Sequence, residues 1–134
     1  MKFRVFVAVL AASLVAAGAA MSGNHVQILT GSFRTVISGK SSQLNGTWVL
    51  KIDQFGQSTT SKNGKVVVKG AVAATGGKFA ITDTGGSAAC TGIQAAGAYT
   101  YTLKSNQLKL TATFDQCSGR KTILTTHPLT KIGV

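Results

Sequence analysis

The sequence predicts an all-β protein, an antiparallel up-and-down meander of about six to eight short strands closed into a small barrel. Short runs alternate between apolar and polar residues, and turn-forming pairs such as Asn63-Gly64 and Gly76-Gly77 separate the runs. No stretch shows helical periodicity, although a short helical turn would fit between residues 87 and 96. Because a meander must protect its edge strands, closure into a barrel is the simplest arrangement.

Residues 1–20 have the features of a secretory signal peptide. A basic start at residues 1–4 precedes an apolar run over residues 5–16, and the small residues of a cleavage site follow at residues 17–19. The apolar run is short for a membrane span, which makes a retained anchor the weaker alternative. We therefore expect a secreted or periplasmic protein that begins at Ala20 or Met21.

The barrel domain is expected over residues 44–134. Its clearest part is the hairpin over residues 97–115, in which a polar break at Ser105-Asn106 separates two alternating runs. A further strand is expected over residues 120–126. The side chains predicted to face the barrel interior are Trp48, Leu50, Val66, Val68, Phe79, Ile81, Tyr99, Tyr101, Leu108, Leu110 and Phe114.

Two segments have less regular patterns. Residues 21–43 contain a weak alternation interrupted by Gly31, and they are expected to form either an N-terminal arm or a first strand. Residues 54–64 are rich in Gly, Ser, Thr and Asn, and are expected to form a loop.

The charge is strongly positive and evenly spread. The 14 Lys and Arg residues of the chain include Lys2 and Arg4, so residues 21–134 keep 12 of them against three Asp, a net charge of +9. Dispersed basic residues are typical of a solvent-exposed β surface, whereas a specific nucleic-acid site would cluster them. We expect no specific nucleic-acid partner, a monomer, and at most weak contact with anionic envelope surfaces.

Few residues are suited to catalysis. The segment from residue 21 onward has no glutamate, three Asp, and two His that lie near its opposite ends. This is a small supply of general acids and bases, so no enzymatic activity and no cofactor are expected.

Cys90 and Cys117 are the only cysteines. In an exported protein this pair favours a disulfide, which would stabilise the fold by about 3–4 kcal/mol through loop closure. A metal site with His25 and His127 is the alternative, but it lacks the short ligand spacing of such sites, and no metal is expected.

The Gly46-Thr47-Trp48 motif, together with Arg120 on the last expected strand, resembles the signature of the calycin superfamily, which includes lipocalins, fatty-acid-binding proteins and avidin. The resemblance implies a lipocalin-like barrel in which Trp48 closes one end and Arg120 stacks over its ring. Gly46, Trp48 and Arg120 would then be structural residues.

The segment Asp115 to Arg120 resembles the C-terminal motif of small secreted bacterial lipocalin-like proteins. There, Asp115 and Gly119 would shape the turn that leads to Arg120. Leu44 to Leu50 is also similar to the first strand of periplasmic metalloprotease inhibitors, which would give an N-terminal arm at residues 21–28 an inhibitory role.

We therefore expect a non-enzymatic barrel that binds a small apolar ligand. The alternatives are a protease-inhibitor-like barrel and a structural envelope protein in which the same inner side chains fill the core. The residues predicted to contact a ligand are Trp48, Leu50, Phe79, Tyr99, Tyr101, Leu110 and Phe114.

Overall fold

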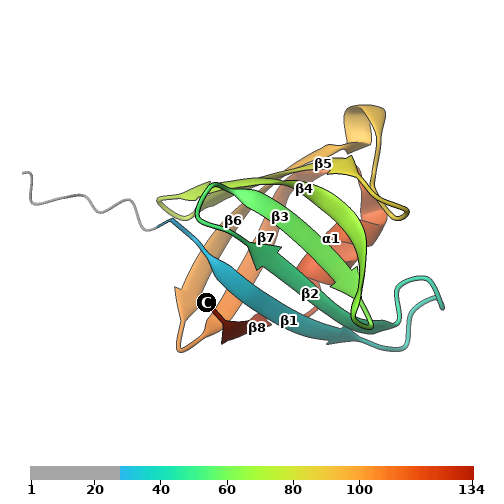
Figure 1. Cartoon of the computed structure of the whole chain (residues 1–134), viewed down its shortest axis with the longest axis horizontal. Coiled ribbons are helices and arrows are strands. Elements are labelled where there is room, and N and C mark those ends of the chain that lie inside the picture. The colour runs from blue at the N-terminus through green and yellow to red at the C-terminus, as the bar shows by residue number, and fades with distance from the viewer. Residues whose placement is uncertain (1–27) are drawn as a thin grey trace, which may run out of the picture.

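Eight antiparallel strands close into a barrel in the computed structural model, which describes residues 28–134 (Figure 1). Each strand pairs with the next along the chain, and the last strand pairs with the first. The expected all-β up-and-down barrel is therefore confirmed. The expected signal peptide and the start of the N-terminal arm lie outside the described residues.

The elements follow one another in the order β1 (Gly31–Ile37), β2 (Gly46–Ile52), β3 (Gln57–Lys62), β4 (Lys65–Thr75), β5 (Lys78–Gly85), the 3₁₀ turn η1 (Gly92–Gln94), β6 (Ala96–Lys104), β7 (Gln107–Asp115), α1 (Ser118–Thr125) and β8 (Leu129–Gly133). One end of the barrel, on the right in Figure 1, carries the loop before β2, the β3–β4 turn, the segment before β6 that contains η1, and α1. We call this the α1 end. The opposite end carries the other three turns and the C-terminus.

Two strands, β1 and β3, occupy segments in which apolar and polar residues do not alternate clearly. β1 pairs with both β2 and β8, so the barrel begins at Gly31 and not at Leu44. β3 lies within residues 54–64, which were wrongly predicted to be a loop. Its six residues are all polar, so alternation of apolar residues is absent although the backbone pairs on both sides.

The strand predicted over residues 120–126 is wrong, because this segment forms the helix α1. Its buried residues are Arg120, Ile123 and Leu124, a spacing that places them on one helical face. The β-branched residues that suggested a strand are accommodated because hydroxyls donate to carbonyl oxygens four residues earlier, from Thr122, Thr125 and Thr126. No helix among residues 28–134 is both long and apolar enough to cross a membrane.

Two β-bulges reverse the expected facing of side chains. In β7, Ala98 pairs with Phe114 and Tyr99 pairs with Ala112, so Thr113 is an extra residue. The alternation shifts there, and Phe114 is 59% exposed on the outside instead of facing inward. An extra residue at Val67 in β4 has the same effect on Val66, which is also exposed.

The core fills the barrel away from the α1 end. Phe33, Phe79, Tyr99 and Leu108 are at most 2% exposed. The ring of Phe79 packs edge-on against Tyr99, with ring centroids 5.9 Å apart. The cluster is completed by Leu29, Leu50, Ile52, Val72, Ala74, Ile81, Leu110, Leu124 and Leu129.

Candidate functional site

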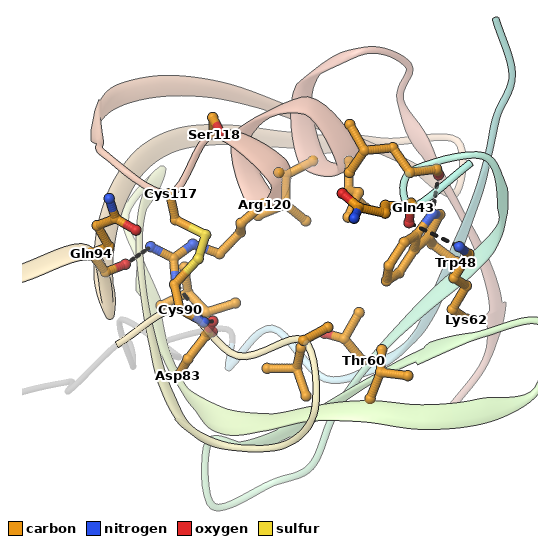
Figure 2. Close-up of a pocket in the computed structure, with 18 of the residues that line it drawn as sticks. Gln43, Trp48, Thr60, Lys62, Asp83, Cys90, Gln94, Cys117, Ser118 and Arg120 are labelled. Atoms are coloured by element: carbon orange, nitrogen blue, oxygen red, sulfur yellow. Dashed lines mark hydrogen bonds and ion pairs between the residues drawn. A yellow bond between two sulfur atoms is a disulfide. The ribbon is translucent and has the colours of Figure 1, made fainter. Parts of the chain in front are cut away.

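A pocket of about 530 Å³ lies at the α1 end, between α1, the segment before β6 and the inner faces of β2 to β5 (Figure 2). Its walls combine apolar side chains with a smaller number of polar ones. The lining residues are Gln43, Leu44, Trp48, Thr60, Lys62, Val67, Val68, Ile81, Asp83, Ser87, Ala88, Cys90, Gln94, Cys117, Ser118, Gly119, Arg120, Ile123 and Leu124.

The apolar part of the pocket has two sources. Ile81 and Leu124 belong to the main core, so the packed interior ends at the pocket. Trp48 and Ile123 belong to a second, smaller cluster, against which Leu44 and Val67 pack. The pocket therefore lies where these two hydrophobic clusters leave space between them.

Trp48 is 4% exposed, as expected, and its indole nitrogen donates to the Leu44 carbonyl oxygen at 2.7 Å. The predicted stacking of Arg120 on this ring is wrong. Instead the Lys62 ammonium lies 5.7 Å from the ring centroid, within cation–π range. Figure 2 shows Trp48 and Lys62 on one side of the pocket and Arg120 with the disulfide on the other.

Lys62 reaches the pocket because of its place on β3. It pairs directly with Trp48 across the β2–β3 ladder, so the two side chains share the inner face. Its ammonium donates to the carbonyl oxygens of Ser42 and Gln43 at 2.9 and 2.8 Å. These bonds attach the loop before β2 to the rim of the barrel.

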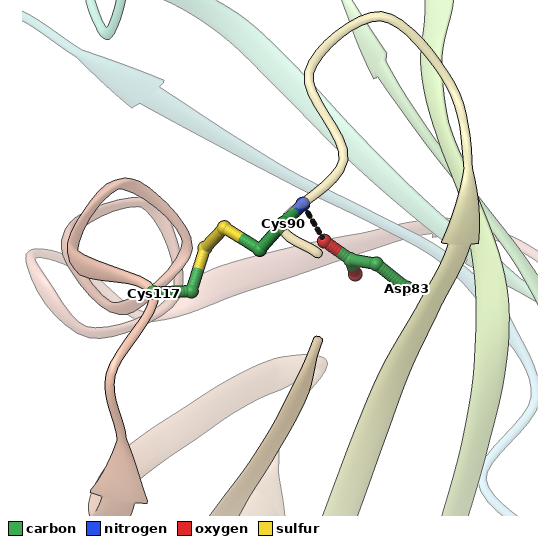
Figure 3. A group of neighbouring side chains, drawn as sticks. All are labelled: Asp83, Cys90 and Cys117. Atoms are coloured by element: carbon green, nitrogen blue, oxygen red, sulfur yellow. Dashed lines mark hydrogen bonds between the residues drawn. A yellow bond between two sulfur atoms is a disulfide. The ribbon is translucent and has the colours of Figure 1, made fainter. Parts of the chain in front are cut away.

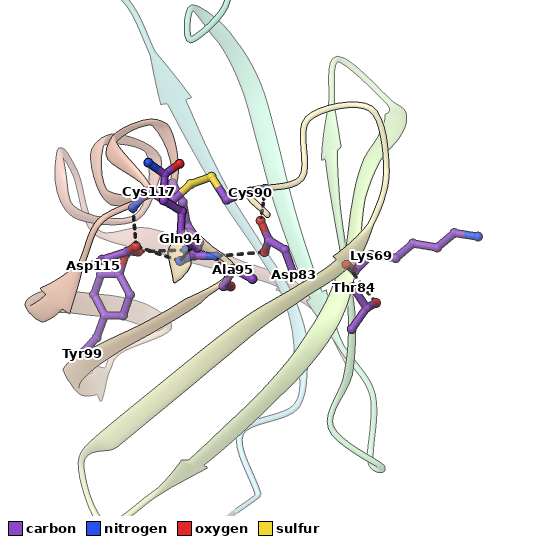
Figure 4. A network of polar contacts seen from close by, with 10 residues as sticks. Lys69, Asp83, Thr84, Cys90, Gln94, Ala95, Tyr99, Asp115 and Cys117 are labelled. Atoms are coloured by element: carbon purple, nitrogen blue, oxygen red, sulfur yellow. Dashed lines mark hydrogen bonds and ion pairs between the residues drawn. A yellow bond between two sulfur atoms is a disulfide. The ribbon is translucent and has the colours of Figure 1, made fainter. Parts of the chain in front are cut away.

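Arg120 is the centre of a buried ion-pair network, and Figure 4 labels its partners Asp83 and Asp115. Its guanidinium contacts Asp115 through Nε at 2.8 Å and Nη2 at 2.7 Å, and Asp83 through Nη1 at 3.1 Å. Nη1 and Nη2 also donate to the carbonyl oxygens of Ala95 and Gln94. Four guanidinium N–H donors therefore make hydrogen bonds, Asp83 adds an ion pair, and Arg120 fixes the segment before β6 against α1.

The network shifts the pKa values of Tyr99, Asp115 and Arg120. Burial raises the pKa of Tyr99, and its hydrogen bond to Asp115 adds to the effect. Burial opposes ionisation of Asp115, but hydrogen bonds from Arg120 and Tyr99 keep the pKa of this carboxyl below its usual value. Burial likewise disfavours the charge on Arg120, yet Asp115 and Asp83 raise the pKa of its guanidinium. The ionised pair of Arg120 and Asp115 is thus the stable state at neutral pH.

The predicted disulfide between Cys90 and Cys117 is confirmed and forms part of the pocket wall (Figure 3). The backbone N–H groups of the two cysteines donate to Asp83 and Asp115, respectively. Asp83 and the two sulfur atoms are close enough to be considered as metal ligands. The sulfurs are bonded to each other and Asp83 is paired with Arg120, so this group is not available to a metal.

The two glycines predicted to be structural differ. Gly46 has a φ of 146°, and a Cβ there would lie 2.9 Å from the Asn63 side chain, so the position requires glycine. Gly119 lies in α1 and not in a turn, and a Cβ there would meet Leu44 at 3.5 Å, an ordinary contact.

Most of the predicted ligand contacts do not line the pocket. Trp48 does, whereas Leu50, Phe79, Tyr99 and Leu110 are buried in the core, Tyr101 packs against it, and Phe114 is on the outside. Thr60 and Lys62 line the pocket but were not predicted as site residues. Their signal was present as polar residues at alternate positions of β3, but it was attributed to a loop.

Comparisons with models of protein families, with curated proteins and with solved structures find no match to this chain.

Proposed function

We propose that this chain is a lipocalin-like, non-enzymatic barrel that binds a small, mainly apolar ligand in the pocket at the α1 end. The observation that carries the proposal is the open space of about 530 Å³ inside a barrel that is otherwise filled. Pockets for small molecules usually measure about 300–1,000 Å³ and combine apolar walls with a few polar groups. The lining described above has this composition.

The pocket is also held in shape before any ligand arrives. The disulfide and Arg120 join α1 to the segment before β6, and Lys62 holds the loop before β2. A site that is already ordered loses less conformational entropy on binding, which favours affinity. The disulfide also fits the oxidising compartment that we propose for the mature protein.

The rival functions have less support. A structural envelope protein would need no open interior. The arm that a protease inhibitor would use falls mostly on residues 21–27, outside the described part of the chain. As for catalysis, Asp83 is the one carboxylate among the lining residues, and it is engaged by Arg120, which leaves it poorly placed as a general base.

Ligand binding is best tested by the fluorescence of Trp48, the only tryptophan in the chain, which lies in the pocket wall. A panel of fatty acids, retinoids and porphyrins is titrated into the protein. We expect saturable binding by at least one class. Thr60→Phe adds a ring to the inner face of β3 and should abolish it, while the neighbouring Thr59→Phe faces outward and should leave it unchanged.

The proposal fails if no member of the panel perturbs Trp48 or shows a heat of binding in calorimetry. If Thr59→Phe and Thr60→Phe both fold and lose ligand affinity equally, the ligand binds somewhere other than this pocket.

A further inference from the structure

We propose that the ligand is an amphipathic monoanion, a medium-length hydrocarbon chain with one carboxylate, whose acid group binds Lys62. This inference rests on the proposed function, since it assigns a ligand class to the same pocket. It is argued from the position of Lys62, from its unbalanced charge and from the sign of the net charge of the described barrel.

Lys62 is an inward-facing cation at the rim of the barrel. The residues that β3 turns inward are Ser58, Thr60 and Lys62, of which Ser58 is buried and the other two line the pocket. β3 therefore presents a polar stripe to an interior whose other strands contribute mainly apolar side chains. The stripe ends in the ammonium group beside the Trp48 ring.

The charge of Lys62 is not balanced by the protein. Both ion pairs found among residues 28–134 involve Arg120, and neither involves Lys62. An ammonium has three donors, and two of those on Lys62 are used by the neutral carbonyls of Ser42 and Gln43. Arg120, the second basic residue of the pocket, makes four hydrogen bonds and has two carboxylates beside it. Lys62 is thus the group that an anion would meet.

The described barrel as a whole has a net charge of the same sign. Residues 28–134 contain 12 Lys and Arg against three Asp, and the side chains of Asp83 and Asp115 are only 4% and 0% exposed. Asp53 is the one Asp side chain left near the surface of the described barrel. Such a field attracts small anions and raises their rate of association.

The rest of the pocket suits a hydrocarbon chain. Ile81 and Leu124 form its inner part at the edge of the core, and Trp48 and Ile123 form an apolar wall. A carboxylate at Lys62 would therefore leave its chain free to lie against these residues, where burial of methylene groups is favourable. Thr60 next to Lys62 on the same face offers a hydroxyl to the acid group.

The test compares decanoate with decanol, which has the same chain and no charge, by isothermal titration calorimetry at pH 7. The wild-type protein should bind decanoate at least about tenfold more tightly, the value of one charge-assisted hydrogen bond. Lys62→Gln should remove this preference, so that the variant binds decanoate no more tightly than decanol. Lys62→Arg keeps the charge and should retain the preference. Lys51→Gln is the control, because it removes one charge from the exposed outer face of β2.

Failure of this inference can be distinguished from failure of the proposed function. Equal affinity of the wild type for decanoate and decanol overturns the inference but leaves a ligand-binding barrel. An equal loss in Lys51→Gln shows that the overall field acts and overturns the assignment to Lys62. Loss of decanol binding in Lys62→Gln shows that Lys62 acts by anchoring the loop before β2, and this also overturns its assignment as the partner of the acid group. No binding of either probe overturns the inference, and the wider panel then decides separately on the proposed function.

Discussion

The two ends of the barrel share one backbone architecture and differ in what their strands turn inward. Away from the α1 end, the core residues Phe33, Phe79, Tyr99 and Leu108 are almost completely buried. At the α1 end, β3 contributes a threonine and a lysine, Thr60 and Lys62, and open space remains. Closure of an eight-stranded barrel fixes its diameter, so the size of the inward side chains decides whether the interior is filled.

Under the proposed function, this difference separates stability from binding along one axis of the molecule. Large apolar side chains at the packed end supply most of the hydrophobic stabilisation. The α1 end has less apolar packing, and it is reinforced by a disulfide and by the Arg120 network. Substitutions at the packed end should therefore change the hydrophobic contribution to stability, whereas those at the α1 end should change the reinforcement of the pocket. Both effects can be measured.

The largest effect is expected from Phe79→Ala at the packed end. Phe79 is 1% exposed, and removing its ring should lower the free energy of unfolding by about 3–5 kcal/mol. Urea unfolding measures this, with Phe55→Ala as the control because Phe55 is 79% exposed and should change stability by less than about 0.5 kcal/mol. A loss below about 1 kcal/mol in Phe79→Ala would show that the packed end does not carry the fold.

Asp115→Asn tests the reinforcement of the α1 end. Removing one carboxylate from the buried network should cost about 3 kcal/mol at pH 7, since Arg120 loses a partner. The native pKa of Asp115 is lowered, so its contribution is fully present above the unfolded pKa of about 4 and is lost as the pH falls through the native value. The stability difference between wild type and variant should therefore shrink below about pH 4.

Asp53→Asn is the control for Asp115→Asn. Asp53 accepts the N–H groups of Phe55 and Gln57 in a turn, at a distance from the Arg120 network. Its replacement should change stability by less than about 1 kcal/mol. A difference between wild type and Asp115→Asn that persists unchanged at low pH would contradict the assigned role of the ion pair.

The packed end was largely predictable from the sequence because its residues alternate strongly. The inward facing of Phe79, Tyr99, Leu108 and Leu110 follows from a period of two, and the structure places all four in the core. The closed barrel was predicted because a meander must protect its edges, and the disulfide because a chain expected to be exported has two cysteines. The prediction for Phe114, near the α1 end of β7, failed because the bulge at Thr113 leaves no trace in the alternation itself.

The α1 end was poorly predictable because its residues depart from those patterns for functional or tertiary reasons. β3 has no apolar residue, so periodicity gave no strand signal. α1 is rich in β-branched residues, and its i, i+3, i+4 spacing includes a buried arginine that is satisfied only by the distant Asp83 and Asp115. Departures from local rules at a site are expected where a binding surface must be built.

The smallest effect on stability is expected from Gly119→Ala, and Gly97→Ala is the matched substitution with which it is compared. Gly119 lies in α1 where a Cβ would make only ordinary contact with Leu44, so alanine should stabilise the protein by about 0.4–1 kcal/mol by restricting the unfolded chain. At Gly97 a Cβ would lie 2.6 Å from an Asp115 oxygen and 3.0 Å from Arg120 Nη2. There the same substitution should destabilise the fold by about 1–3 kcal/mol.

Both substitutions add one methyl group near the α1 end, so they differ only in how tightly their surroundings are packed. Gly119 lines the pocket, where space remains, whereas Gly97 abuts the buried ion pairs. Thermal unfolding of the two variants in parallel compares them directly. Opposite signs are expected because the open pocket and the closed network lie side by side within the same end of the barrel. Destabilisation of equal size in both variants would show that the pocket wall at α1 is as tightly packed as the network, and would remove the space on which ligand binding depends.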